Sequence, residues 1–494
     1  MFAPIGSGRP AGHRRREIRK GRNVRFPDAS ANRGAARQRP VADSLGRHGQ
    51  AYATAAAVAS GRRRYRFRES LFALPTVLVA VGVALAEATA YLDRALDDDG
   101  PVGWGVQMNS NGATWLLSTV AGATITTAGV VFSLTVVSLQ LASSQFSPRV
   151  MRSFIRDRVS QTVIGMLVAT FVFCVLTLRH ISGNATDPAP RIPLTTALIL
   201  TVGTVVLIIA YLGRLARGLQ VGEVVRTIAA EADGVIGAAS HAAQRETTGA
   251  TVPDIPEGKP QLIVRAVRDG WVTQVPTEQI LAAVPAATVV RLETRTGAYI
   301  HRGEVLLRVS PIPRRDDRVR RRLESAVDIA DSRTMQQDVD FALRQLVDIA
   351  LRALSAAIND PTTATEVVLR LGSLLRTLLV TDMPPVAVSG RDGRTLLRPW
   401  LLSPPEYVDH AFDQIRQACP RQLHVAVALA RVLRMLIDHV TECGRREHVP
   451  SLRRQLRLLV DGVSAEPGLH LEDLQRFLAV AESTVDPAEH DTSN

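Results

Sequence analysis

Few side chains in this 494-residue sequence have the types and spacing that catalysis requires. The phosphate-binding pattern GxxxxGK[ST], the hydrolase pattern GxSxG and the zinc pattern HExxH do not occur in it. The late histidines lie 14, 15 and 9 residues apart, not at the i,i+4 spacing of two ligands on one helix face: His410, His424, His439 and His448. The three cysteines are too scattered for a zinc site or a disulfide framework, and fit a reducing compartment. We therefore expect no catalytic residue, metal or cofactor, and an enzyme is the least favoured class.

The most distinctive polar residues lie inside an apolar stretch. They follow one another at spacings of three and four, with a glutamine one heptad beyond the last: Thr119, Gly122, Thr126, Gly129, Ser133 and Gln140. In an α-helix this spacing forms one stripe, which we call the α-stripe. Facing lipid, hydroxyls gain nothing and glycines leave a groove, so we expect the α-stripe to face protein or water.

Two interpretations of the α-stripe remain open. In the first, its small-xxx-small pairs let two helix backbones approach closely. In the second, copies of this helix surround a pathway in which the hydroxyls and the Gln140 amide replace the hydration shell of an ion. For the second interpretation, the predicted span offers no ring of charged side chains that would set ion selectivity.

Two acidic residues are further candidates. Glu87 lies near the outer end of an apolar run, where an intramembrane acid is a functional candidate and an ordinary solvated residue is the simpler interpretation. Asp360 stands between Asn359 and Pro361, and Asp before Pro is typical of a helix N-cap followed by the first helical position. We interpret these three residues as a tight structural corner between helices, with catalysis by Asp360 as the less favoured alternative.

Four long apolar runs must position these residues. A bilayer core takes about 20 apolar residues of helix to cross, and each run reaches that length. The sequence therefore predicts an α-helical integral membrane protein whose four-span domain covers residues 61–217, with spans at about 70–91, 114–141, 159–178 and 192–213. A cleaved signal peptide ending near Ala88-Thr89-Ala90 is the alternative for the first run, but the leader would be unusually long.

Charge sets the expected orientation. Arginines precede the first span at Arg62, Arg63, Arg64, Arg66 and Arg68, and aspartates follow it. Arginines again fill the loop between spans two and three and follow span four, so we expect a bacterial inner-membrane protein with both termini in the cytoplasm.

The net charge of +12 belongs to one end of the chain. Residues 1–68 hold 17 of the 59 Lys and Arg but only 3 of the 47 Asp and Glu, so the remainder sums to −2. We interpret residues 1–60 as a basic disordered tail and expect the five clustered arginines to contact anionic lipid headgroups, with no nucleic-acid partner.

The pattern of apolar, polar and turn residues divides the part of the chain after the spans into four segments. We predict a helical extension and linker at 218–260, a small β domain at 261–310, a mainly helical domain at 318–483 and a disordered tail at 484–494. Within the helical domain, SGRDGRT (389–395) is predicted as a turn between two short strand-like pieces. The β segments resemble the hairpins of biotinyl and lipoyl modules, which implies a structural version here because no lysine occupies a hairpin tip.

Three strings resemble one bacterial family. They are LASSQFSPRVMRSFIRDR (141–158), RTMQQDVDFALRQLVDIALRALSAAINDPTTA (333–364) and AFDQIRQ (411–417). The chain is similar over about residues 65–480 to the predicted membrane proteins of unknown function designated DUF2254. The resemblance implies four spans and a cytoplasmic C-terminal region, and it implies no activity.

Two function classes follow. In the favoured one, a homo-oligomer forms a channel-like or transport pathway around the second span, and the cytoplasmic region assembles or gates it. In the alternative, the spans anchor a scaffold whose cytoplasmic region binds a protein or lipid partner.

Overall fold

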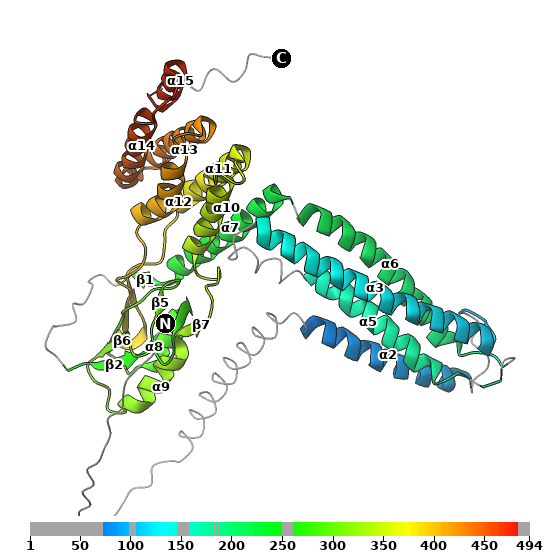
Figure 1. Cartoon of the computed structure of the whole chain (residues 1–494). Helices are drawn as coiled ribbons and strands as arrows, with labels where there is room; N and C mark the ends of the chain where they lie inside the picture. The colour runs from blue at the N-terminus through cyan, green and yellow to red at the C-terminus, as the bar shows by residue number, and fades with distance from the viewer. Residues whose placement is uncertain are drawn as a thin grey trace, which may run out of the picture. The chain divides into compact units, whose positions relative to one another are not determined.

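A computed structural model describes residues 73–97, 105–145, 158–181, 183–184, 187–218, 220–248 and 260–482 (Figure 1). The tail 1–60, the five arginines Arg62, Arg63, Arg64, Arg66 and Arg68, and the tail 484–494 lie outside the described residues. The expectations for those segments therefore stay predictions.

Four helices coincide with the four predicted apolar runs. They are α2 (Ala73–Asp97), α3 (Ser110–Gln145), α5 (Arg158–Leu178) and α6 (Arg191–Gly218). Each contains a segment long and apolar enough to cross a bilayer. The prediction of four candidate spans is confirmed, and α3 and α6 extend a few residues beyond the predicted limits.

Helix α5 is the central member of this set. It packs against α2, α3 and α6, and it is the most buried of the four. Two glycines permit its closest approach to α2. A Cβ on Gly165 would lie 2.8 Å from the Cα of Pro75, and a Cβ on Gly82 would lie 2.9 Å from the carbonyl oxygen of Ala169. Small residues thus let the backbones of these two spans touch.

The β region contains two sheets. The larger has the order β1-β8-β9-β4-β6-β2, and its strands are antiparallel except for the parallel pair β4 and β9. Its strands are β1 (Thr247–Thr248), β2 (Leu262–Arg265), β4 (Val289–Leu292), β6 (Val305–Ser310), β8 (Ala387–Ser389) and β9 (Thr395–Leu397). The smaller sheet has the order β5-β3-β7, with β3 (Gly270–Gln274), β5 (Tyr299–Ile300) and β7 (Asp328–Ala330).

The larger sheet draws on three strands outside the range 261–310 that the sequence assigned to it. Strand β1 comes from the predicted linker, and β8 and β9 come from the predicted helical domain. The hairpin β8–β9, which encloses the short 3₁₀ turn η1 (Arg391–Gly393), matches the predicted SGRDGRT turn. Helices α8 (Thr277–Ala283) and α9 (Asp316–Ala326) complete this region, and both contribute to its apolar core.

The helical region has one continuous core. Its helices are α7 (Val221–Arg245), α10 (Val339–Ala353), α11 (Pro361–Leu378), α12 (Pro404–Ala418), α13 (Leu423–Glu442), α14 (Val449–Ser464) and α15 (Leu471–Glu482), with a 3₁₀ turn η2 (Arg446–His448). Helix α10 buries an apolar face that includes Leu343, Leu346 and Val347, and α11 buries one that includes Val367 and Leu371. Helix α7 packs on α10 and α11 and buries Val225 and Ile228 in the same core.

The contact between α2 and α5 gives a first prediction. Replacing Gly165 with leucine forces a side chain into the backbone of α2, so we expect it to destabilise the folded protein in detergent by about 2 kcal/mol. The matched control is Gly203→Leu on α6, where a Cβ meets nothing within 4 Å. Thermal unfolding followed by circular dichroism checks this, and equal melting temperatures for the two variants would contradict the described packing.

Candidate functional site

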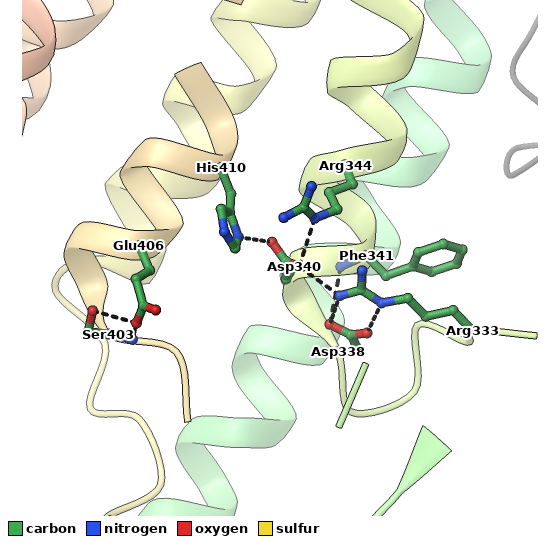
Figure 2. A network of polar contacts seen from close by, with 8 residues as sticks. All are labelled: Arg333, Asp338, Asp340, Phe341, Arg344, Ser403, Glu406 and His410. Atoms are coloured by element: carbon green, nitrogen blue, oxygen red, sulfur yellow. Dashed lines mark hydrogen bonds and ion pairs between the residues drawn. The ribbon is translucent and has the colours of Figure 1, made fainter. Parts of the chain in front are cut away.

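A buried polar network lies between the β region and the helical region (Figure 2). It begins at Asp338, the N-cap of α10, whose side chain accepts a hydrogen bond from the backbone N–H of Phe341 at 3.2 Å. The guanidinium of Arg333 donates two hydrogen bonds to this carboxylate, with Nε to Oδ2 at 2.5 Å and Nη2 to Oδ1 at 2.9 Å. This two-bond geometry is the strongest form of the arginine–carboxylate pair.

Asp340 is the most buried acid of the network, with 1% of its side chain exposed. Its carboxylate accepts a hydrogen bond from Nη2 of Arg333 at 2.7 Å and one from Nε of Arg344 at 3.1 Å. Its other oxygen lies 2.7 Å from Nδ1 of His410, on α12. The site therefore joins a loop and two helices through one carboxylate, as Figure 2 shows.

The same arginine also contacts the β region. Its guanidinium lies over the ring of Trp271 in β3 at 5.8 Å and over the ring of Phe341 at 5.4 Å. Gly297 lies against the pair, because a Cβ there would collide with Asp338 and would lie 2.7 Å from Arg333. Gly297 also has a φ of +80°, which favours glycine. Arg333 therefore holds the two regions together.

The charges of the network shift its acids in opposite directions. Burial alone would raise the pKa of Asp340, but hydrogen bonds from His410 and Arg333 and the attraction of Arg333 and Arg344 outweigh it and lower the pKa below 3.8. For Asp338, burial dominates the opposing effect of Arg333, so its pKa is raised. Burial also raises the pKa of the Tyr407 hydroxyl. The network is thus an ionic junction built around Asp340.

The geometry favours positioning over catalysis. His410 is 25% exposed and Arg333 is 10% exposed, so the network is reached by solvent only at its edge. Ser403 is occupied in the capping box of α12 with Glu406, so it is not an activated nucleophile for His410. Among the described residues, no group of three His, Cys, Asp or Glu side chains could hold a metal ion.

The α-stripe lies on the free face of α3. All six residues are exposed: Thr119, Gly122, Thr126, Gly129, Ser133 and Gln140. A Cβ added at Gly122 or Gly129 would meet nothing within 4 Å. The opposite face of α3 is buried instead, with Leu117, Ala121 and Val131 in the cores shared with α5. Within the described residues of the spans, the glycines at close contacts between helices are thus Gly82 on α2 and Gly165 on α5.

Glu87 belongs to a polar cluster at one end of the spans. Its carboxylate oxygen Oε1 pairs with Nη2 of Arg179 at 2.5 Å, and His180 lies 3.7 Å from the other oxygen. Arg94 contacts the same histidine at 2.8 Å, and Asp93 accepts a hydrogen bond from the first turn of α6 at Ile192. The Glu87 side chain is half exposed. Together these polar contacts join the neighbouring ends of α2, α5 and α6.

The corner residues lie at the start of α11. The side chain of Asp360 accepts hydrogen bonds from the N–H and the hydroxyl of Thr363, at 3.0 and 2.6 Å, and Pro361 is the first helical residue. These bonds lower the pKa of Asp360. Asn359 has a φ of +49° and accepts a hydrogen bond from Gln422 at 2.8 Å. The Asp360 carboxylate and the Asn359 amide oxygen thus both have structural partners.

A hollow of about 450 Å³ opens on the β region. Its walls come from the segment after β4, from β5 and β6, and from the segment after β9, and the exposed side chains of Tyr299 and Trp400 are among them. Inside it, Glu293 binds Arg308 at 2.8 Å and accepts a hydrogen bond from the Trp400 indole at 3.3 Å. Arg295 also lines it. Charged side chains and two aromatic rings thus line the hollow.

Sequence reasoning missed the network and the hollow. Four members of the network lie inside 333–364, one of the strings that carried the family resemblance: Arg333, Asp338, Asp340 and Arg344. The fifth, His410, directly precedes the string 411–417, and its spacing from the other late histidines spoke only against a pair of ligands on one helix face. In the structure its Nδ1 lies 2.7 Å from the Asp340 carboxylate. The available signal was that these charged residues lie in, or directly beside, two of the strings that carry the family resemblance.

The four apolar helices and the folded β and helical regions define a predicted membrane protein of several parts. A family model described as "Predicted membrane protein (DUF2254)" matches residues 68–435, so the chain belongs to that family. This confirms the resemblance.

The curated relatives are named as uncharacterized proteins. The uncharacterized proteins Mb1321c of Mycobacterium bovis and Rv1290c of Mycobacterium tuberculosis are each 31% identical over 418 residues, which is 80% of this chain and 77% of theirs. The uncharacterized protein MT1328 of Mycobacterium tuberculosis is 30% identical over 417 residues, with the same shares covered. No solved structure matches the chain.

The network predicts how the stability of the folded protein depends on pH. Asp340→Asn removes the charge that Arg333, Arg344 and His410 face, so we expect a loss of about 3 kcal/mol of stability at neutral pH. Because the pKa of Asp340 is lowered on folding, its contribution is complete above 3.8 and is lost as the pH falls below that value. Melting temperatures of wild type and variant should therefore converge in acid.

The matched control is Asp461→Asn, an exposed acid on α14. It should leave the melting temperature unchanged at every pH. A wild type and an Asp340→Asn variant that melt together at neutral pH would show that the network does not hold the regions together.

Proposed function

We propose that this protein is a homo-oligomeric bacterial inner-membrane protein whose copies meet along the α-stripe and enclose a channel-like path. The observation that carries the proposal is the exposure of all six stripe residues on the face of α3 opposite α5. A face of small and hydroxyl-bearing residues suits another helix or a watery path better than lipid. The β and helical regions then assemble or gate the path.

The arrangement of the spans supports a path between copies. Helix α5 packs against each of the other three spans, so the centre of a single chain is filled by a helix. Copies that bring their α3 helices together would place the grooves at Gly122 and Gly129 face to face. Close backbone approach at such grooves is the usual geometry of small-xxx-small contacts.

The hydrogen bonds of the stripe hydroxyls support a cation as the ion that passes along the proposed path. Thr119 donates to the carbonyl of Trp115, and Thr126 donates to the carbonyl of Gly122, each at 2.8 Å. A hydroxyl whose proton is used in this way still presents oxygen lone pairs outward. Oxygen lone pairs replace the hydration shell of a cation, and the stripe holds no charged side chain that would reject one.

We place both termini in the cytoplasm, because arginines flank the spans on that side and aspartates follow span one. The cluster at Arg62, Arg63, Arg64, Arg66 and Arg68 then meets anionic headgroups. A fluorescent protein that folds only in the cytoplasm, fused after Asn494, should make cells fluoresce. A dark fusion present at normal abundance would contradict this orientation.

The hollow beside Trp400 favours a second candidate, a membrane-anchored scaffold or receptor. Two exposed aromatic rings beside charged walls form a surface that a protein or small-molecule partner would fit. In that function the spans only anchor the chain, and no ion crosses. The two candidates therefore differ in ion flux.

Cysteine cross-linking tests the contact along α3. In a Cys443→Ser background, which removes the exposed native thiol, Ser133→Cys should form disulfide-linked dimers in oxidised membranes. Phe132→Cys is the matched control, because Phe132 is also exposed but lies about 100° around the helix from Ser133. Equal cross-linking at the two positions, or none at Ser133→Cys, would contradict assembly along the α-stripe.

Ion flux tests the path itself. Liposomes that contain the wild-type protein should be at least tenfold more permeable to K⁺ than empty ones, and Thr126→Leu with Ser133→Leu should remove most of the difference because it removes lining oxygens. Phe132→Leu serves as the control. Wild-type vesicles no leakier than empty ones would exclude the path and leave the scaffold.

A further inference from the structure

Helix α9 and the turn before it carry the densest positive charge in the described part of the chain. Six arginines fall within nine residues: Arg314, Arg315, Arg318, Arg320, Arg321 and Arg322. We call them the α9 arginines. The only acids in this stretch and the rest of the helix are Asp316, Asp317 and Glu324, so the segment keeps a net charge of +3.

One face of α9 is buried and the other carries the charge. Val319, Leu323 and Ala326 belong to the core of the β region, where α9 packs against α8 and β2. Five of the α9 arginines are exposed, and Arg320 is partly buried. The apolar face thus fixes the helix to the β region, where Figure 1 labels it, and the arginines are held outward on a rigid support.

What distinguishes these arginines is their clustering on one helix, because single exposed arginines elsewhere, such as Arg376, also have no acidic partner in the described part of the chain. Among the described residues, none of the six lies within ion-pair distance of a carboxylate. Elsewhere in the same regions, buried arginines such as Arg333 and Arg398 are paired at 2.5 to 2.7 Å. Nε of Arg320 is buried without an acceptor. A cluster of unneutralised guanidinium groups on a folded surface is a site for anions from outside the chain.

We propose that the α9 arginines bind the anionic headgroups of the bilayer to which the chain belongs. Several clustered basic residues on one amphipathic helix attract anionic lipid, and each arginine fits a phosphate with two hydrogen bonds. The four candidate spans tether α9 near a membrane, which raises the effective concentration of headgroups around it. The contact would hold the β region against the membrane surface.

The composition of the segment favours lipid over nucleic acid. Proteins that bind single strands stack bases on aromatic rings, and readers of duplex bases use Asn and Gln beside Arg. Residues 311–326 contain no aromatic side chain and no Asn or Gln. The segment therefore offers a net positive charge without the side chains that recognise bases, which suits the surface of a bilayer rich in anionic lipid.

Energy transfer from α9 to lipid tests the proposal on the full-length protein. Ser325→Cys, exposed on α9, carries the donor dye in the Cys443→Ser background, and a headgroup-labelled lipid is the acceptor. The protein is reconstituted in phosphatidylcholine alone and with about one third phosphatidylglycerol. We expect about a twofold rise in transfer with the anionic lipid, and loss of the rise at about 1 M salt, where charges are screened within a few ångströms.

Two variants separate local from overall charge. Changing Arg314, Arg318, Arg321 and Arg322 to glutamine should abolish the rise. The matched control changes four exposed arginines of the helical region to glutamine and should keep it: Arg376, Arg431, Arg453 and Arg457. Melting temperatures check that both variants fold.

Transfer that does not respond to phosphatidylglycerol in the wild type would overturn the proposal without reference to any variant. A wild type that instead binds a short RNA, and loses that binding in the first variant, would assign the α9 arginines to nucleic acid and likewise overturn it. Equal responses of both variants would show that general charge, not α9, causes the effect.

Discussion

The packing of α5 against its three neighbours is the constraint on which the membrane part depends. Helix α5 contacts all three other spans and is the most buried of the four, and Gly82 and Gly165 let α2 and α5 meet backbone to backbone. With α5 in that position, α3 can bury only one side within the chain. Its other side, the α-stripe, is therefore exposed in a single chain, and the proposed assembly starts from that exposure.

The folded part after the spans depends on a different interaction, the burial of Asp340 among two arginines and His410. A buried carboxylate is tolerated only when opposite charges and hydrogen bonds surround it. Because Arg333 also stacks on Trp271, the ionic junction joins the helices to the β region. A proposed gating movement would disturb this junction, which is one of the places where the two regions share charges; the Arg398–Glu246 pair is another.

Local patterns in the sequence predicted local structure. Four apolar runs predicted four helices, and the sequence Asp360-Pro361 predicted the start of α11. The sheet was only partly predictable, because β8 and β9 join strands that lie about a hundred residues earlier in the chain. The network was missed for the same reason. His410 and Asp340 are 70 residues apart, and spacing along the chain carries no sign of that contact.

The spacing of the α-stripe predicted one helix face but not which neighbour it meets. That neighbour is the central question, and the mass of the protein extracted with its native lipids into polymer-bounded discs tests it most directly. Assembly along the α-stripe predicts particles that hold two or more copies of the 53.5 kDa chain. The double substitution Gly122→Leu with Gly129→Leu should reduce them to one copy. Wild-type particles that hold a single chain would contradict it.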